Sequence, residues 1–132
     1  MDLINVIELL DLGDERGGLV ALEGNDTVPF KIRRVYYIIN TKKGVSRGFH
    51  AHKKLKQLAV CIAGSCNLIL DNGLEKESVF LDSPLKGVII DKMIWHEMHD
   101  FSDNCVLMVL ADDIYDEDDY IRDYKVFEKN GK

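Results

Sequence analysis

The sequence predicts an all-β domain, a sandwich or a barrel, with a short helix or an extended arm at its C-terminal end. Short segments rich in Val, Ile, Leu, Tyr and Phe are separated by glycine-containing breaks along most of the chain, which is the pattern of strands and turns. Asn72-Gly73 lies between two such segments and is a strong hairpin signal, because both residues tolerate positive φ. Apolar residues at helical spacing occur only in the tail.

The predicted strands follow one another at short intervals up to residue 111. Turn signals such as Lys43-Gly44 and Ala63-Gly64-Ser65 separate them. In chain order the predicted strands are Ile4–Leu10, Leu19–Glu23, Ile32–Asn40, Gly48–His52, Gln57–Ala63, Cys66–Asp71, Glu75–Leu81, Gly87–Asp91 and Asn104–Ala111. So many short strands in a small chain favour two packed sheets or a closed barrel.

The tail differs from the rest of the chain. Tyr120, Ile121, Tyr124 and Phe127 recur at roughly helical spacing, which fits a short amphipathic helix or an extended arm. An acidic run from residue 112 to residue 123 overlaps its start. We interpret that run as a solvated face without chemistry of its own.

Composition limits the class of protein. The chain has 132 residues, of which 46% are hydrophobic, and a net charge of −6, so we expect a single domain over residues 1–132. The acidic balance argues against a nucleic-acid polymer as partner. The sequence contains neither a membrane-length apolar stretch nor a secretory signal pattern. With three cysteines and no Cys-x-x-Cys motif, we expect buried reduced thiols in a cytoplasmic protein.

The histidines form two clusters, His50-Ala51-His52 and His96-Glu97-Met98-His99. Residues i and i+2 of a strand share a face, so His50 and His52 present two imidazoles side by side. A single core histidine is usually structural, but this pair stands next to Arg47. We therefore favour a functional role for the pair.

The spacing around the histidine pair resembles the first motif of the cupins, which are jelly-roll (double-stranded β-helix) barrels. The matching positions are Gly44, His50, His52, Gln57 and Gly64. Cupins carry Glu where this chain has Gln57, and their carboxylate helps two histidines and a third one to hold a divalent metal. Replacement by a neutral amide removes the hard anionic ligand, so we expect no metal and no other cofactor.

The second cupin motif is only partly present. It begins at Gly87, but His96 arrives early and Trp95 stands where the motif has a glycine. A metal-free imidazole near its ordinary pKa of ~6.5 is suited to take and return a proton at neutral pH. Trp95 and Phe101 are candidates to stack on a base or a sugar face, although a core position for Trp95 is the stronger interpretation.

A longer set of motifs resembles one family, the dTDP-4-keto-6-deoxyglucose 3,4-ketoisomerases. The resemblance rests on residues 47–53 (Arg-Gly-Phe-His-Ala-His-Lys), 64–66 and 95–98 (Trp-His-Glu-Met), and on residues 14–19, 33–37 and 120–122. It implies a cupin jelly roll that acts on a thymidine-diphosphate sugar without metal or redox cofactor. The ketone moves from C4 to C3 through an enediolate, which supplies precursors of deoxyamino sugars for surface polysaccharides. It also implies a homodimer with an exchanged N-terminal segment.

The same resemblance implies roles for individual residues. His52 is expected to be the base at C3, His50 its partner, and Tyr37 the hydroxyl that moves a proton between sugar oxygens. The residues expected to bind substrate are Arg16, Arg33, Tyr36, Arg47, Trp95 and His96. Guanidinium groups suit a diphosphate because they are planar and always charged.

Two other functions remain open at this point. A metal-dependent cupin oxygenase or sugar isomerase needs at least three metal ligands, which metal analysis of the purified protein would reveal. A non-catalytic module for nucleotide sugars predicts saturable binding without exchange of the sugar C3 hydrogen. The related 3,5-epimerases are usually longer, and the Arg-Gly-Phe-His-Ala-His string points away from them.

Overall fold

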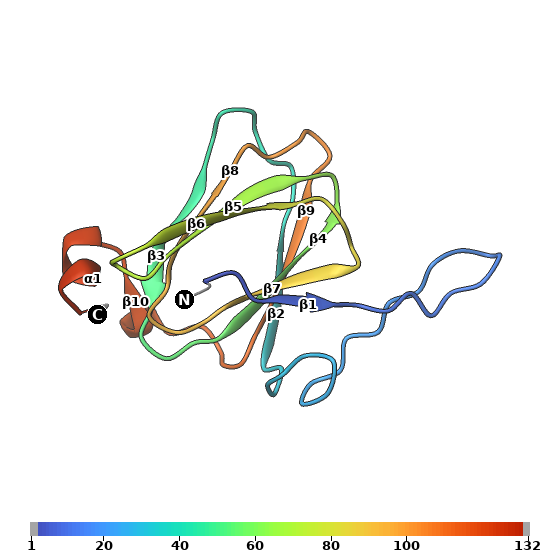
Figure 1. Ribbon diagram of the computed structural model, residues 1–132, viewed down its shortest axis with the longest axis horizontal. Helices are drawn as coiled ribbons and strands as arrows, with labels where there is room; N and C mark the ends of the chain where they lie inside the picture. Colours follow the sequence, from blue (N-terminus) through green and yellow to red (C-terminus); the bar gives the residue numbers. More distant parts are fainter. Residues whose placement is uncertain (1–2, 131–132) are drawn as a thin grey trace.

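The computed structural model of the protein describes residues 3–130 as two antiparallel sheets that pack face to face (Figure 1). The first sheet has the order β1 (Val6–Glu8), β7 (Lys86–Ile90), β4 (Gln57–Ala63), β9 (Val106–Ala111), β2 (Arg34–Ile38). The second has the order β10 (Tyr120–Ile121), β3 (Arg47–His52), β8 (Trp95–His99), β5 (Cys66–Asp71), β6 (Lys76–Leu81). A 3₁₀ turn (Glu117–Asp119) and α1 (Tyr124–Asn130) complete the chain. The predicted all-β jelly-roll class is confirmed.

The main core lies between the sheets and follows the two-residue period of the strands. Ala59 and Cys61 of β4 point into it, as do Leu68 and Leu70 of β5. The remaining buried members of this core are Cys66, Leu81, Val88, Ile90, Met98, Phe101, Cys105, Leu107 and Val109. Both inner faces are therefore apolar over most of their area, which is what sheet-on-sheet packing requires.

The N-terminal segment covers the outer face of the first sheet. Leu58 and Val60 of β4 point outward and are still fully buried, in a second core with Leu9, Val28 and Phe30. β4 is buried on both faces for this reason, and its run of apolar residues does not alternate with polar ones. Figure 1 shows the rest of this segment in loops that extend to the right, away from β3 and β10.

The helix α1 covers the outer face of the second sheet. Trp95 of β8 is 4% exposed and packs there with Ala51, Ile121 and Phe127. Tyr124 anchors the helix by donating a hydrogen bond to Asp71 at 2.7 Å. Among the described residues no helix has the length and apolarity to span a membrane.

The structure differs from the predicted elements at three places. Leu19–Glu23 is not a strand, because this part of the N-terminal segment has no neighbouring strand to bond with and is held by turns instead. Conversely, Trp95–His99 forms β8, a central strand for which the sequence predicted none. Each face of β8 carries both polar and apolar side chains, so the strand lacks the usual alternation of polar and apolar residues along the sequence. The predicted C-terminal helix is confirmed as α1, but it begins only at Tyr124. Tyr120 and Ile121, which were expected in the same helix or arm, form β10 because they pair with β3.

Candidate active site

A cavity of about 570 Å³ lies between the two sheets, where β2 faces β3 and the C-terminal segment. Its walls combine aromatic, cationic and imidazole side chains. The lining residues are Arg34, Tyr36, Tyr37, Ile38, Ile39, Arg47, Gly48, His50, Met98, Tyr120 and Arg122. Volume and polar content suit a small organic ligand with negative charge.

A β-bulge in β3 determines which side chains reach this cavity. Gly48 pairs with Glu97 while His50 pairs with the adjacent His96, so β3 has one residue more than β8 at this step. The backbone passes close to β8 here, since a Cβ on Gly48 (φ +93°) would lie 2.9 Å from the carbonyl oxygen of His96. Residues three apart on a regular strand face opposite ways. Because of the bulge, Arg47 and His50 both line the cavity.

His50 is the histidine of the cavity wall. Its Nδ1 lies 3.1 Å from the carbonyl oxygen of Gly48, and a carbonyl can only accept, so Nδ1 carries the proton and Nε2 has a free lone pair. Burial, and secondly the neighbouring His52, lower the pKa of His50 to about 4. The imidazole is neutral at pH 7 and ready to accept a proton.

His52 lies behind His50 and does not line the cavity. It is 3% exposed, and its Nδ1 lies 3.1 Å from Oδ2 of Asp119. Burial lowers the pKa of His52, and the Asp119 carboxylate partly offsets this. His52 therefore does not line the cavity as His50 does, and its expected role as the base at C3 stays a prediction. Its ring centroid is 5.0 Å from that of His50.

His96 is completely buried behind the same pair. Its Nδ1 lies 3.3 Å from the carbonyl oxygen of Ile94, and its Nε2 has no hydrogen-bond partner. Burial is the largest of the causes that lower the pKa of His96 to about 3. Ring nitrogens of His50, His52 and His96 all lie within 4.8 Å of one another, so these three residues could hold a metal ion. The expectation of metal independence stays a prediction.

The two adjacent tyrosines of β2 have different surroundings. Tyr36 faces the interior and donates a hydrogen bond to Oε1 of Gln57 at 2.8 Å. Burial raises the pKa of Tyr36 to about 12, so its hydroxyl keeps its proton at neutral pH. Tyr37 also lines the cavity, near its rim, since it is 64% exposed. The hydroxyl of Tyr36 is thus held inside the protein, and the expected role of Tyr37 stays a prediction.

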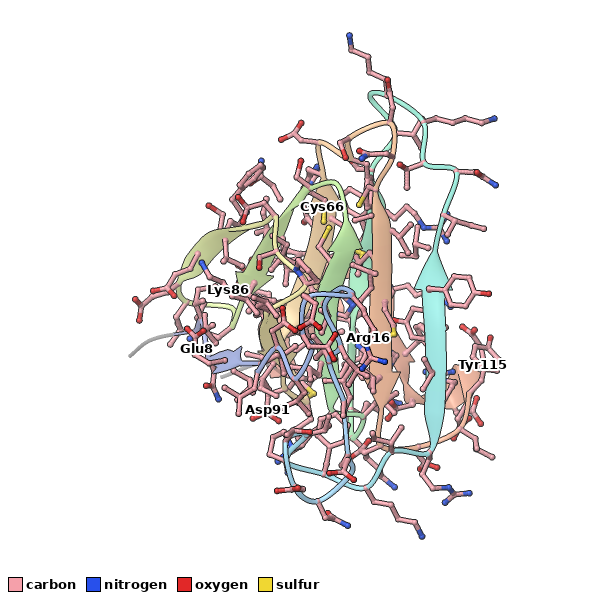
Figure 2. All side chains as sticks on the ribbon, turned by 90° about the vertical axis from the view of Figure 1, so that its right-hand side faces the viewer. Glu8, Arg16, Cys66, Lys86, Asp91 and Tyr115 are labelled. Carbon is pink, nitrogen blue, oxygen red and sulfur yellow. The ribbon has the colours of Figure 1, made fainter. Side chains whose placement is uncertain are left out.

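The arginines divide in the same way. Arg34, Arg47 and Arg122 line the cavity, whereas Arg33 points away and pairs with Asp113 at 4.0 Å. Arg16 lies on the N-terminal segment, paired with Asp14 and 85% exposed at its side chain (Figure 2). Within this chain Arg16 does not join the cavity. Nor does Trp95, which packs under α1 on the opposite face of β8 from His96.

Sequence reasoning missed three contributors from the C-terminal segment. Tyr120 packs its ring against both His50 and His52, with centroids 4.8 and 4.4 Å away. Arg122 lies over the Tyr120 ring at 4.2 Å and lines the cavity. Asp119, the partner of His52, stands inside the acidic run that was interpreted as a solvated face. The available signal was the position of this run directly before Tyr120-Ile121-Arg122.

The buried imidazoles predict loss of stability in mild acid. His96 has a pKa of about 3 in the folded chain and ~6.5 when unfolded, so only the unfolded chain takes up its proton between these values. The stabilisation by the neutral form is complete above pH ~6.5 and falls by about 1.4 kcal/mol per pH unit below it. The Tm should therefore fall steeply from pH 6.5 to pH 4.5 in a calorimetric series. A His96→Gln variant should show a shallower slope; an identical slope would contradict this origin.

Comparisons with known proteins agree with one another. The family model "FdtA: WxcM-like, C-terminal" matches residues 2–132. A TDP-4-oxo-6-deoxy-α-D-glucose-3,4-oxoisomerase from Aneurinibacillus thermoaerophilus is 56% identical over 94% of this chain and 89% of its own length. A 3,4-ketoisomerase from Helicobacter canadensis has a TM-score of 0.94 at 41% identity, over 98% of this chain and 97% of that one. A variant of the 3,4-ketoisomerase QdtA from Thermoanaerobacterium thermosaccharolyticum, in complex with TDP-4-keto-6-deoxyglucose, also has a TM-score of 0.94. It is 40% identical, and the match covers 97% of this chain and 93% of that one.

Proposed function

Since the chain belongs to the FdtA family of TDP-sugar 3,4-ketoisomerases, we propose that the neutral imidazole of His50 carries the proton between C3 and C4 of the sugar. The enzyme isomerises a TDP-4-keto-6-deoxy sugar to the 3-keto form, in deoxysugar biosynthesis. The observation that carries the assignment is the position of His50 in the cavity wall with a free Nε2.

The first step is removal of the C3 proton. This proton is acidic because C3 is α to the C4 ketone, and its electrons delocalise onto O4 as an enediolate. Nε2 of His50 accepts the proton, and return of a proton to C4 while O3 loses its own gives the 3-ketone. The base must be neutral before the step, and the lowered pKa of His50 meets this condition at every pH above about 4.

The oxygen atoms exchange a proton in the same reaction, since O4 gains one and O3 loses one. Tyr36 is the hydroxyl we assign to this transfer. Its raised pKa keeps it protonated, and the hydrogen bond to Gln57 fixes its direction. The negative charge of the enediolate develops beside Arg47, while Arg34 and Arg122 complete a cationic wall for the diphosphate.

Asp119 is a positioning residue in this scheme, because it holds the ring of His52 through Nδ1. Asp119→Asn should lower kcat by about 10- to 100-fold, with a smaller change in KM, by analogy with partners that orient imidazoles elsewhere. Asp119→Glu should restore part of the activity. Steady-state kinetics of these variants would check this, with Asp118→Asn as the control because that side chain is exposed and makes no hydrogen bond within residues 3–130. Equal losses in kcat for Asp118→Asn and Asp119→Asn would contradict the assignment.

Incubation with TDP-4-keto-6-deoxyglucose in deuterated water, followed by NMR, tests the function itself. We expect formation of the 3-keto isomer and entry of deuterium at the carbon that is reprotonated. Saturable binding of the nucleotide sugar without any exchange would instead identify a binding module and refute the mechanism.

The three converging imidazoles make metal-dependent chemistry the second candidate. We propose that the enzyme needs no metal, because the carboxylate position is occupied by Gln57, whose Oε1 already accepts from Tyr36. Full turnover after exhaustive chelation is the expected result. Loss of turnover that zinc, iron or manganese restores would establish the metal-dependent alternative.

We also propose a homodimer in which the N-terminal segment reaches the cavity of the partner. Loops of this segment extend away from β3 and β10 (Figure 1), and its side chains Leu10, Leu12 and Leu19 are 71%, 60% and 56% exposed. In a partner's cavity Arg16 would add a cation for the diphosphate.

We also propose that this biosynthetic enzyme is located in the cytoplasm. Its free cysteines support this location, and recovery of the enzyme from cell membranes or medium would contradict it.

Co-expression of two inactive variants tests this arrangement. If Arg16 acts across the dimer, a heterodimer of Arg16→Ala and His50→Asn has one doubly altered site and one intact site. Mixed dimers should then recover up to about half of the activity per dimer. If both residues act within one chain, every site carries one defect, and activity stays at the level of the single variants.

A further inference from the structure

A second group of potential ligands lies away from the catalytic cavity. Cys61 of β4, Cys66 of β5 and Cys105 just before β9 bring their sulfur atoms within 4.8 Å of one another. The Cys61 and Cys105 sulfurs are 3.8 Å apart. None of these residues lines the cavity of His50, and Figure 2 shows Cys66 toward the top of the molecule, with Tyr115 and Asp91 lower down.

This trithiol cluster, Cys61, Cys66 and Cys105, is buried near the turn between β4 and β5. The three residues are 1%, 0% and 2% exposed. The thiol of Cys61 donates to the carbonyl oxygen of Ala63 at 3.2 Å, in the turn between β4 and β5. Ser102 closes this end by two hydrogen bonds with Ser65, both 2.9 Å long. The turn between β4 and β5 therefore lies directly beside the cluster.

We propose that the trithiol cluster is a binding site for a three-coordinate thiophilic ion, with trivalent arsenic as the chemical type that fits. Thiolate sulfur lies about 2.3 Å from a bound ion such as zinc, so three sulfurs around one centre are about 4 Å apart. The spacing of Cys61 and Cys105 already has this value. The three sulfurs come from separate elements and converge without a fourth His, Cys, Asp or Glu ligand among residues 3–130.

Charge distinguishes between ions at this site. The cluster belongs to the main apolar core, next to Leu81, Phe101 and Leu107, where an uncompensated charge is costly. Three thiolates around a divalent ion leave one negative charge, whereas three around a trivalent ion leave none. The reaction is As(OH)₃ with three thiols, which gives three As–S bonds and three waters. Every proton of the thiols leaves in water, and no atom changes oxidation state.

Arsenite is also the probe that separates this cluster from the imidazoles. Soft thiolates select soft ions, and the histidine group has no sulfur to offer. The experiment incubates the reduced full-length enzyme with arsenite, removes the excess, and counts free thiols after denaturation in acid. The chain contains three cysteines, so we expect the count to fall from three to zero. Native mass spectrometry should show one arsenic atom in place of three hydrogens.

Thermal unfolding and activity give independent readouts. Three bonds that connect β4, β5 and the segment before β9 should raise the Tm by several degrees. Isomerase activity should persist, because the cavity is separate. Arsenite should no longer raise the Tm of Cys105→Ser, and the two remaining thiols should still be counted as free or nearly so. Circular dichroism and activity would show that this variant folds.

Three outcomes overturn the proposal. Three free thiols after arsenite treatment of the wild-type enzyme would show that the cluster does not open to the ion or does not bind it. An arsenic content in Cys105→Ser equal to that of the wild type would show that three sulfurs are not required. A His50→Asn variant should bind arsenic like the wild type, and loss of binding in that variant would place the ion at the imidazoles instead.

Discussion

Replacing His50 by Asn should lower kcat for ketone isomerisation by about 10³-fold or more, within the range that general acid–base catalysis contributes. The amide has nearly the size of imidazole but cannot take a proton at neutral pH. The carbon proton then has no acceptor in the cavity wall, because His52 and His96 lie behind it. Product formation and deuterium incorporation, followed by NMR, should fall together, while binding of TDP changes little.

His99→Asn is the matched control for this variant. His99 lies on the outer face of β8, where Ser46 and Glu97 bond its two ring nitrogens at 2.7 and 2.8 Å. It should keep near-normal turnover. If His52→Asn abolished exchange at the sugar carbon while His50→Asn retained it, the base would be His52, and the assignment from the cavity geometry would be wrong.

The acid side of the pH profile gives a second test of the same base. Its pKa of about 4 means that protonation, and with it loss of kcat/KM, should begin only well below the ~6.5 of an ordinary histidine. Rates measured by stopped-flow after brief exposure to acid avoid the slower loss of folded protein. A midpoint near 6.5 would contradict a desolvated neutral base.

Tyr36→Phe should lower kcat by about 10²-fold, and Tyr37→Phe should change it less than about threefold. Both variants remove one hydroxyl from neighbouring residues of β2. Only Tyr36 turns its hydroxyl inward, onto Gln57, so only this change removes the group assigned to move a proton between O4 and O3. Steady-state kinetics of the two purified variants provide the comparison.

The folded state of Tyr36→Phe needs its own check, because the change leaves Oε1 of Gln57 without a donor in a buried position. A Tm within a few degrees of the wild type would assign the rate loss to the reaction. Equal rate losses in Tyr36→Phe and Tyr37→Phe would show that the rim tyrosine also contacts substrate. A larger loss in Tyr37→Phe would restore the role that the resemblance implied for that residue.

The sequence predicted the fold class and most residue types of the site correctly. It predicted less well which of these side chains face the cavity. Strands such as Gln57–Ala63 and Cys66–Asp71 were found with their bounds, because apolar runs between glycine turns have few other solutions. The strand Trp95–His99 was missed because each of its faces carries both polar and apolar groups.

One sequence does not show which face of a strand turns toward the interior. Neighbouring residues such as Tyr36 and Tyr37, or Arg33 and Arg34, face opposite sides of a strand, and which one turns inward depends on the pairing with β9. His50 and His52 share a face as predicted, but their order of depth depends on the C-terminal segment. Asp119 and Tyr120 arrive there from far along the chain, which local spacing cannot show.

The bulge in β3 has a consequence for how related chains are compared. Phe49, with φ +63°, lies within the bulge, where the alternation of side chains between the two faces of β3 shifts by one residue. Arg47 and His50 therefore face the same side because of the backbone conformation. In a homologue that lacks one residue of this bulge, the arginine that corresponds to Arg47 should face outward, even if the two sequences align with high identity. Gap placement at this position thus separates chains that retain a cationic cavity wall from chains that have lost it.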